Sequence, residues 1–496
     1  MNKILSIKIV SIGSIILMSS LFTQVVSANQ IDTTNTIDVL IKKIMEKRKI
    51  PGLQLAIVKN GEIIKLQGYG EANLQHAVKV TNQTVFAINS MTKAFTGVAV
   101  MQLVEQGKLR LDDTIGKHLP ELPTSWHHLT IQQLLANTSG LPKIMSGRGT
   151  ELIANNDPED AWDLVQTLPL EFKANSQFSY NQTGYVILGI IINKLAKENF
   201  TAFITQHQFS IVNMPLTEQA GFTNMQYVVP NQASQYGYGR DGKLNTRYIA
   251  YFPYFRTAAG MSSTAKELAD YVIALQKGNL LNKSSLESLW TPITLNNERT
   301  AGFSSFENGY AMGWQVEKRK AHRGISASGA NANTLIIYPE DNLSIVVLTN
   351  LLGSLPIQFV DEIASIYITD VKKENGWKVP LDIWKQQVAQ KGFKNIAETT
   401  RKVEEELGVY FNHNNINAWG YELLGQKNLE GALAVFILNT EIHPDVANTF
   451  DSLGETYGTL KQYPEALVNY QQVLLLQPNN ESARKKIKYI KELINS

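Results

Sequence analysis

Ser90 and Lys93 stand three positions apart in the stretch Ser90-Met91-Thr92-Lys93. Residues three apart on a helix share a face, so the serine hydroxyl and the lysine amine would lie within reach of one another. A serine hydroxyl is a weak nucleophile until a neighbouring base takes its proton. The pair therefore predicts nucleophilic chemistry at the start of a helix, although the same two residues also occur as a helix N-cap and a solvated surface charge.

The segments around this pair indicate where it lies in the fold. An apolar run at residues 84–88 precedes it, and residues 94–104 are apolar on nearly every face, which predicts a buried central helix. A lysine at the start of a buried helix is costly unless it has partners or a task. Further upstream, Asn60-Gly61 separates two apolar runs and predicts a β-hairpin. The serine is therefore expected after a sheet-forming segment, at the head of a central helix.

Further motifs lie on both sides of the pair. Between residues 35 and 370 the chain also contains Ile50-Pro51-Gly52, Leu134–Pro142, Phe178–Gly189, Ala259–Ala269 and His322-Arg323-Gly324. Taken together, these motifs resemble the superfamily of class C β-lactamases, penicillin-binding proteins and esterases. The resemblance implies an α/β (α+β) fold of the β-lactamase/transpeptidase type, in which an antiparallel sheet is flanked by helices and joined by an all-helical domain.

The resemblance assigns catalytic roles to three residues. Ser90 would be the acylated nucleophile, and Lys93 and Tyr180 would move its proton. Lysine and tyrosine have ordinary pKa values of about 10.4 and about 10, so neither is a good base alone at neutral pH. Each can shift the pKa of the other, and which of them carries the proton is a property of the pair. The alternative for Tyr180 is a core aromatic residue.

Two motif positions depart from the family pattern. Gln182 stands where the family usually has Asn; it carries the same donors and acceptor on a longer stem, so we expect substrate binding with a shifted geometry. His322 stands where class C β-lactamases have the lysine of Lys-Thr-Gly. Histidine offers a hydrogen bond and only a conditional charge, which argues against efficient β-lactam hydrolysis. A histidine on a surface strand is the alternative for His322.

The third motif also predicts the groups that stabilise the transition state. Gly324 would let the strand backbone approach the acyl group, so we expect it and His322 to bind substrate. The backbone amides of Ser90 and Ile325 are the expected oxyanion-hole donors.

Composition excludes several other functions. The chain has 46 basic and 44 acidic residues, a net charge of +2 and no long basic stripe, which argues against nucleic-acid binding. Its eight histidines are scattered, with no His-Glu-x-x-His motif, so no metal site is expected. No glycine-rich phosphate loop stands out, and no cofactor is expected. The absence of cysteine excludes disulfides, thiol chemistry and lipid attachment through a cysteine.

The first 28 residues have the pattern of a signal peptide. Lysines precede an apolar run, and Val26-Ser27-Ala28 provides the small residues that a signal peptidase accepts. We expect cleavage after Ala28, a periplasmic or secreted protein, and no membrane span after cleavage. An uncleaved membrane anchor is the alternative.

After the hydrolase-like region the pattern becomes helical. Residues 371–412 are expected to form a linker and helices. Beyond them a repeat of 34 positions aligns Trp419 with Leu453, Gly420 with Gly454, Ala432 with Ala466, Phe436 with Tyr470 and Pro444 with Pro478. The repeat is similar to the tetratricopeptide pattern, which predicts two repeats over residues 413–480 and a capping helix over 481–496. These helices could recruit a protein partner or stabilise the hydrolase domain.

The sequence thus predicts an exported serine hydrolase that forms an acyl-enzyme with an amide or ester. A D-amino-acid peptide, a β-lactam and a simple ester all remain candidate substrates. The alternative is a low-turnover penicillin-binding or peptide-sensing protein whose repeats recruit a partner.

Overall fold

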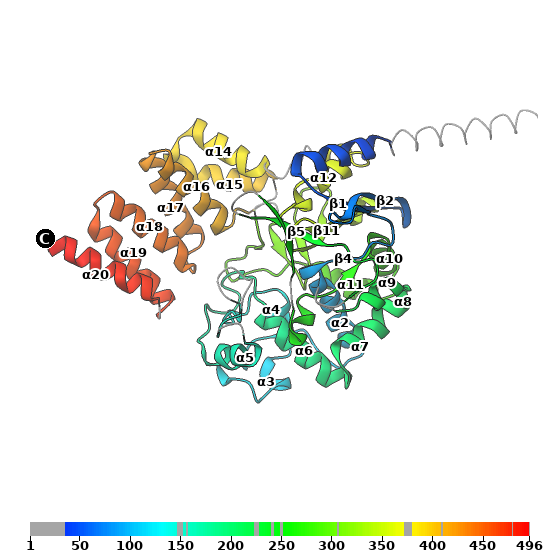
Figure 1. Cartoon of the computed structure of the whole chain (residues 1–496). Coiled ribbons are helices and arrows are strands. Elements are labelled where there is room, and N and C mark those ends of the chain that lie inside the picture. Colours follow the sequence, from blue (N-terminus) through cyan, green and yellow to red (C-terminus); the bar gives the residue numbers. More distant parts are fainter. Residues whose placement is uncertain are drawn as a thin grey trace, which may run out of the picture.

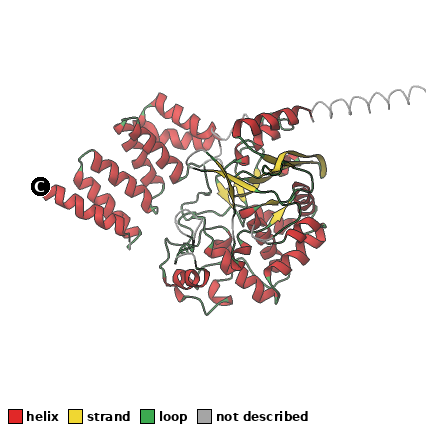
Figure 2. Cartoon of the chain, viewed as in Figure 1, coloured by secondary structure: helices red, strands yellow, loops and turns green. Residues whose placement is uncertain are grey.

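One antiparallel sheet of eight strands organises the N-terminal two thirds of the described chain (Figures 1 and 2). The computed structural model describes residues 35–145, 152–154, 157–222, 228–239, 243–248, 251–304, 307–371, 379–407, 410–478 and 480–495. The expected signal peptide, residues 1–28, lies outside the described residues. Within the described part, no helix has both the length and the apolar character to cross a membrane.

The strands pair in the order β3-β2-β1-β12-β11-β10-β9-β8. Their bounds are β1 Gly52–Lys59, β2 Glu62–Asn73, β3 Val78–Lys79, β8 Gly309–Tyr310, β9 Gln315–Glu317, β10 Gly324–Gly329, β11 Asn333–Tyr338 and β12 Leu343–Thr349. The expected hairpin is present, because Asn60 (φ 53°) and Gly61 (φ 77°) join β1 to β2. Both residues have positive φ, which matches a two-residue turn that follows the strand twist.

Side chains alternate between the two faces of the sheet. On one face, Leu55 and Ile345 belong to an apolar cluster that includes the helix over residues 35–48 and α12 (Val360–Ala364). On the other face, Ala56 and Ala327 belong to a larger cluster that includes the helices of the all-helical part. Both faces of the sheet are therefore covered (Figure 1).

The helix α2 (Thr92–Glu105) lies at the centre of the larger cluster, and every residue from Thr92 to Leu103 is buried. Its continuous apolar sequence explains this burial, since no face of the helix carries a polar stripe. The larger helices around it are α5 Pro158–Thr167, α6 Thr183–Ala196, α10 Ala265–Gln276 and α11 Lys283–Trp290.

Seven helices form the C-terminal part of the described chain: α14 Val379–Lys391, α15 Ile396–Leu407, α16 His413–Gly425, α17 Leu429–Ile442, α18 Ala447–Thr459, α19 Tyr463–Leu476 and α20 Glu481–Asn495 (yellow to red in Figure 1). A Cβ added at Gly420 would come within 2.5 Å of the Phe436 ring, and one added at Gly454 within 3.0 Å of the Tyr470 ring. The same close helix crossing thus occurs at equivalent positions in both pairs, which explains why both positions are glycine.

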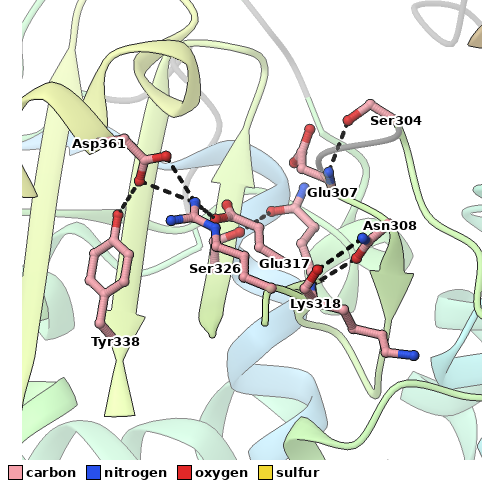
Figure 3. A network of polar contacts seen from close by, with 10 residues as sticks. Ser304, Glu307, Asn308, Glu317, Lys318, Ser326, Tyr338 and Asp361 are labelled. Carbon is pink, nitrogen blue, oxygen red and sulfur yellow. Dashed lines mark hydrogen bonds and ion pairs between the residues drawn. The ribbon is translucent and has the colours of Figure 1, made fainter. Parts of the chain in front are cut away.

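A group of buried charges lies at the C-terminal end of β9 (Figure 3). Glu317 is fully buried, and the guanidinium of Arg319 donates to it and, at 2.9 Å, to Asp361. Tyr338 Oη donates to the same Asp361 carboxylate at 2.5 Å. Burial raises the pKa of Glu317 to about 8, although Arg319 acts in the opposite direction.

Glu307 belongs to this group and makes stability depend on pH. Burial raises its pKa from an ordinary 4.5 to about 7. The folded state therefore binds a proton more tightly than the unfolded state, and stability falls as the pH rises from 4.5 to 7. One pKa unit corresponds to about 1.4 kcal/mol, so the free energy of unfolding should fall by roughly 3 kcal/mol over this pH range. We expect Glu307→Gln to remove this fall. Urea unfolding at pH 5 and pH 8 would measure it.

The matched control for this prediction is Glu287→Gln, because the Glu287 side chain is 61% exposed. The control should change the two urea midpoints equally. An unchanged pH dependence in Glu307→Gln would show that another group causes the loss.

Candidate active site

Ser90 lies in a short 3₁₀ turn (Asn89–Met91) between β4 (Phe86–Ala87) and α2. The preceding Asn89 has a left-handed backbone (φ 53°) and is buried. Its side chain explains why this conformation is held: Asn89 Nδ2 donates to Ala87 O at 3.0 Å, and Asn89 Oδ1 accepts from Tyr251 Oη at 2.9 Å. The turn therefore fixes a partly exposed Ser90 at the head of α2, as the sequence predicts.

Lys93 lies in the first turn of α2 and is 1% exposed. Its ammonium donates to Gln182 Oε1 at 2.7 Å and to Ala258 O at 2.9 Å. The same nitrogen lies 4.7 Å from the centroid of the Tyr180 ring. Burial lowers the pKa of Lys93 well below its ordinary value, because the charged form loses its hydration. Burial therefore favours the neutral amine, which is the form that a proton acceptor needs.

Tyr180 completes the group, since its hydroxyl lies near the side chains of Ser90 and Gln182. Burial raises the pKa of Tyr180 to about 12, and the hydrogen-bonding groups of these two side chains act in the opposite direction. Its ring is partly exposed and packs 5.1 Å, centroid to centroid, from the ring of Phe303. Tyr180 is thus a neutral phenol that lies beside Ser90 and beside Gln182, the side chain that binds Lys93.

Gln182 takes the position predicted for it, next to Lys93 at the start of α6. Its neighbour Asn181 points elsewhere: Asn181 Oδ1 accepts from Thr183 N at 2.7 Å, and Asn181 Nδ2 donates to Leu141 O. The longer side chain of Gln182 therefore supplies the acceptor, and Asn181 shapes the local backbone.

The structure does not bring the third predicted motif to Ser90. His322, Gly324 and Ile325 lie at the start of β10, where His322 Nδ1 is 2.9 Å from Asp341 and His322 Nε2 is 3.2 Å from Asp370. Burial lowers the pKa of His322, but the two carboxylates outweigh burial and raise it overall. His322 is therefore part of a surface ion-pair group.

The opposite end of β10 meets the turn that holds Ser90. A Cβ added at Gly329 would come within 1.9 Å of Ile88 O and 3.2 Å of Asn89 Cβ. Five residues at about 3.3 Å each separate Gly324 from Gly329, so Gly324 lies roughly 16 Å from this contact. Ile325 is paired on both sides, with Ile337 of β11 and Val316 of β9. Its backbone amide therefore lies within the sheet and away from Ser90. The roles expected for His322, Gly324 and Ile325 are corrected accordingly: the segment of β10 beside Ser90 is Ala327–Gly329.

This end of β10 has a free edge. In the described strands, β9 pairs with β10 only from Gly324 to Ser326, while β11 pairs with it as far as Gly329. The backbone of Ala327–Gly329 is therefore unpaired on the β9 side. Sequence reasoning missed Asn89 and Gly329, because the contact between them joins segments that are distant in the sequence.

Within the described residues, no group of three or more histidine, aspartate or glutamate side chains could hold a metal ion. The assembled groups are a hydroxyl, an amine, a phenol and a carboxamide. Their chemistry is proton transfer and nucleophilic attack.

Comparison with known proteins places this arrangement in a family. The model of the Beta-lactamase family matches residues 37–366, more than half of the chain. Protein flp of Staphylococcus aureus (strain MW2) is 30% identical over 325 residues, which cover 64% of each chain. Penicillin-binding protein 4* of Bacillus subtilis (strain 168) is 26% identical over 63% of this chain and 70% of that protein.

Among solved structures, EstCE1, a hydrolase with promiscuous acyltransferase activity, has a TM-score of 0.58 at 19% identity. The match covers 68% of this chain and 99% of that one, and it shows a shared fold. The sheet and its helices therefore have the β-lactamase/transpeptidase-like fold, followed by a C-terminal helical region. The chain belongs to the Beta-lactamase family.

Proposed function

We propose that this protein is a serine hydrolase that forms an acyl-enzyme on Ser90. The observation that carries the proposal is the position of Tyr180 beside Ser90, with the nitrogen of the buried Lys93 4.7 Å from the centroid of its ring. A surface serine and a solvated lysine would not account for this arrangement, because burying a lysine without a task is costly.

The proposed mechanism begins when Ser90 Oγ attacks the carbonyl carbon of an amide or ester. The serine proton passes to the Tyr180 oxygen as the Tyr180 proton passes to the neutral amine of Lys93. A phenol with a pKa of about 12 cannot act as a base alone, so the lowered pKa of Lys93 supports this shared transfer. The same groups return the proton to the leaving amine or alcohol. A water molecule then repeats the sequence and releases the acid.

One feature supports an amide or peptide substrate. The unpaired edge of β10 at Ala327–Gly329 can bind an extended backbone by strand addition. We propose that an amide of this segment joins the Ser90 amide as the oxyanion donor. The segment carries no charged side chain for a substrate carboxylate, whether that of a β-lactam or of a peptide terminus. D-amino-acid peptides, β-lactams and esters all belong in the test.

We further propose that residues 1–28 direct export to the periplasm or the medium. For the C-terminal part we propose tetratricopeptide-like repeats, on the basis of the 34-position period and the glycine–aromatic contacts described above. Since the alignment covers 64% of the flp proteins, their own activities are not transferred to the whole chain.

A low-turnover penicillin-binding or peptide-sensing protein is the second candidate. One observation favours it: Gln182, which stands where the family usually has Asn, accepts from Lys93 at 2.7 Å, and its longer side chain would place the hydrolytic water less well. In this case acylation would occur and deacylation would be slow.

Turnover separates the two candidates. The mature protein is incubated with nitrocefin, a p-nitrophenyl ester and a D-Ala-D-Ala peptide, and product release is followed together with the mass of the intact protein. We expect steady product release from the ester or the peptide. A stable adduct on Ser90 without product would favour the sensor, and neither adduct nor product from any of the three would exclude both candidates.

A further inference from the structure

A cavity of about 340 Å³ lies between the hydrolase domain and the first C-terminal helices. Residues 176–180 and 299–304 line it on one side, together with Lys143, Leu295, Asn297 and Asn308. Residues 410–414 and 443–446 line it on the other side. Its size is at the lower end of small-ligand sites, and it lies between two domains, where such sites are frequent.

The cavity continues from the catalytic group. Tyr180 lines it, and the adjacent Phe303 ring belongs to the same lining. Phe303 follows Gly302, whose carbonyl accepts from Asn412 Nδ2 of the helical part at 3.5 Å. Nearby, Arg299 Nη1 lies 3.3 Å from Glu404 Oε1 and pairs the two parts across their boundary. One continuous wall therefore leads from the catalytic tyrosine to the helices.

The helical side of the cavity is held firmly in the helical core. Phe411 is fully buried, and its ring stacks 4.6 Å from that of Trp384. Asn439 Nδ2 donates to His413 O at 3.0 Å, and His443 Nε2 lies 3.1 Å from Phe411 O. The wall is thus anchored by the core of the helices, as a preformed binding site requires.

The cavity contains polar groups that need partners. Ser176 and Thr300 are each 8% exposed, and both line the cavity. Their hydroxyl oxygens are buried and have no hydrogen-bond partner among the described residues. Burial lowers the pKa of His413 to about 4 and that of His443 to about 3. These imidazoles are therefore neutral at physiological pH and serve as hydrogen-bonding groups.

Hydroxyls and neutral imidazoles beside an aromatic wall, together with the charged Lys143, Arg299 and Asp445, suit the amide groups and polar side chains of a peptide. A buried hydroxyl without a partner costs about 1–3 kcal/mol, which a bound amide would recover. A simple ester at Ser90 would leave these groups unpartnered.

We propose that this cavity is a substrate subsite shared by the hydrolase domain and the first helix pair. It binds the part of a peptide substrate that extends beyond the residues at the scissile bond. The inference rests on the proposed function, because it takes Ser90 as the site of reaction. The helices then determine which peptides are cleaved, in addition to any partner that they recruit.

The test compares two peptides with the same D-Ala-D-Ala terminus, an N-acetylated dipeptide and a pentapeptide. We expect the wild-type protein to favour the pentapeptide at least 10-fold in kcat/KM. Asn414→Trp fills the cavity from its exposed helical side and should reduce this ratio to near 1. Gln471→Trp, on the exposed surface of α19, is the matched control and should keep the wild-type ratio.

A second variant tests the hydroxyl directly. Thr300→Val removes a group without a partner, so it should lower pentapeptide kcat/KM about 5-fold while the melting temperature is maintained. Equal kcat/KM for both peptides in the wild-type protein would overturn the subsite while leaving the proposed function intact.

If neither peptide reacts, the proposed peptidase activity fails, and binding then decides the subsite. Calorimetry of the pentapeptide with the full-length Ser90→Ala protein should show binding that Asn414→Trp weakens at least 10-fold. Equal or absent binding in the two proteins would overturn the subsite.

Discussion

Ser90→Ala is expected to abolish both acylation and hydrolysis, because it removes the only atom that forms the bond to the acyl group in the proposed mechanism. The loss in kcat should be on the order of 10⁴-fold or more, as for other serine nucleophiles that act together with a base. Product release and intact-protein mass measure the two steps separately. Folding should be preserved, since the Ser90 side chain is partly exposed and the turn is held by Asn89.

Ser284→Ala is the matched control, because Ser284 is an exposed residue of α11. It should keep the wild-type rates. Retention of acylation by Ser90→Ala would move the nucleophile elsewhere and remove the basis of the proposed function.

Arg319→Met is expected to destabilise the folded protein severely. It would leave the fully buried Glu317 and the Asp361 carboxylate without their cation (Figure 3). Breaking a buried pair from one side typically costs about 3–5 kcal/mol, because an uncompensated charge remains in the interior. Urea unfolding at pH 8 measures the loss. The loss should be smaller at pH 6, where Glu317, with its pKa raised to about 8, binds a proton.

Arg323→Met provides the comparison on the same segment of the chain. Arg323 is 27% exposed and pairs with Glu287 and Glu340, which are both more than half exposed. Surface pairs contribute about 0–1 kcal/mol, so this variant should unfold close to the wild type. Similar losses of unfolding free energy in Arg319→Met and Arg323→Met would show that burial does not increase the contribution of the Arg319 ion pairs to stability.

Local sequence signals predict a large part of this molecule. The Asn60-Gly61 turn, the buried helix after Ser90 and the helix pairs beginning at 413 and 447 follow from backbone preferences and apolar periodicity. The approach of Tyr180 and Gln182 to Lys93 is predicted through the family motifs, and the structure brings them together. Their catalytic roles stay proposals.

The register of β10 cannot be predicted in the same way. Gly324 and Gly329 lie at the two ends of one six-residue strand, and either glycine could face a substrate. The contact of Gly329 with Ile88 and Asn89 determines which end of the strand lies beside Ser90. These segments are distant in the sequence, and no periodic pattern indicates that they meet. The position of the helices beside the active site is unpredictable for the same reason, since the boundary consists of isolated contacts such as Arg299 with Glu404.

The Phe303 ring connects the helical part to Tyr180. It packs 5.1 Å, centroid to centroid, from the Tyr180 ring and stands one residue after Gly302, whose carbonyl accepts from Asn412 of the helical part. A substitution in the loop before α16 would therefore reach the Tyr180 ring through Gly302 and Phe303, although it lies more than two hundred positions away in the sequence.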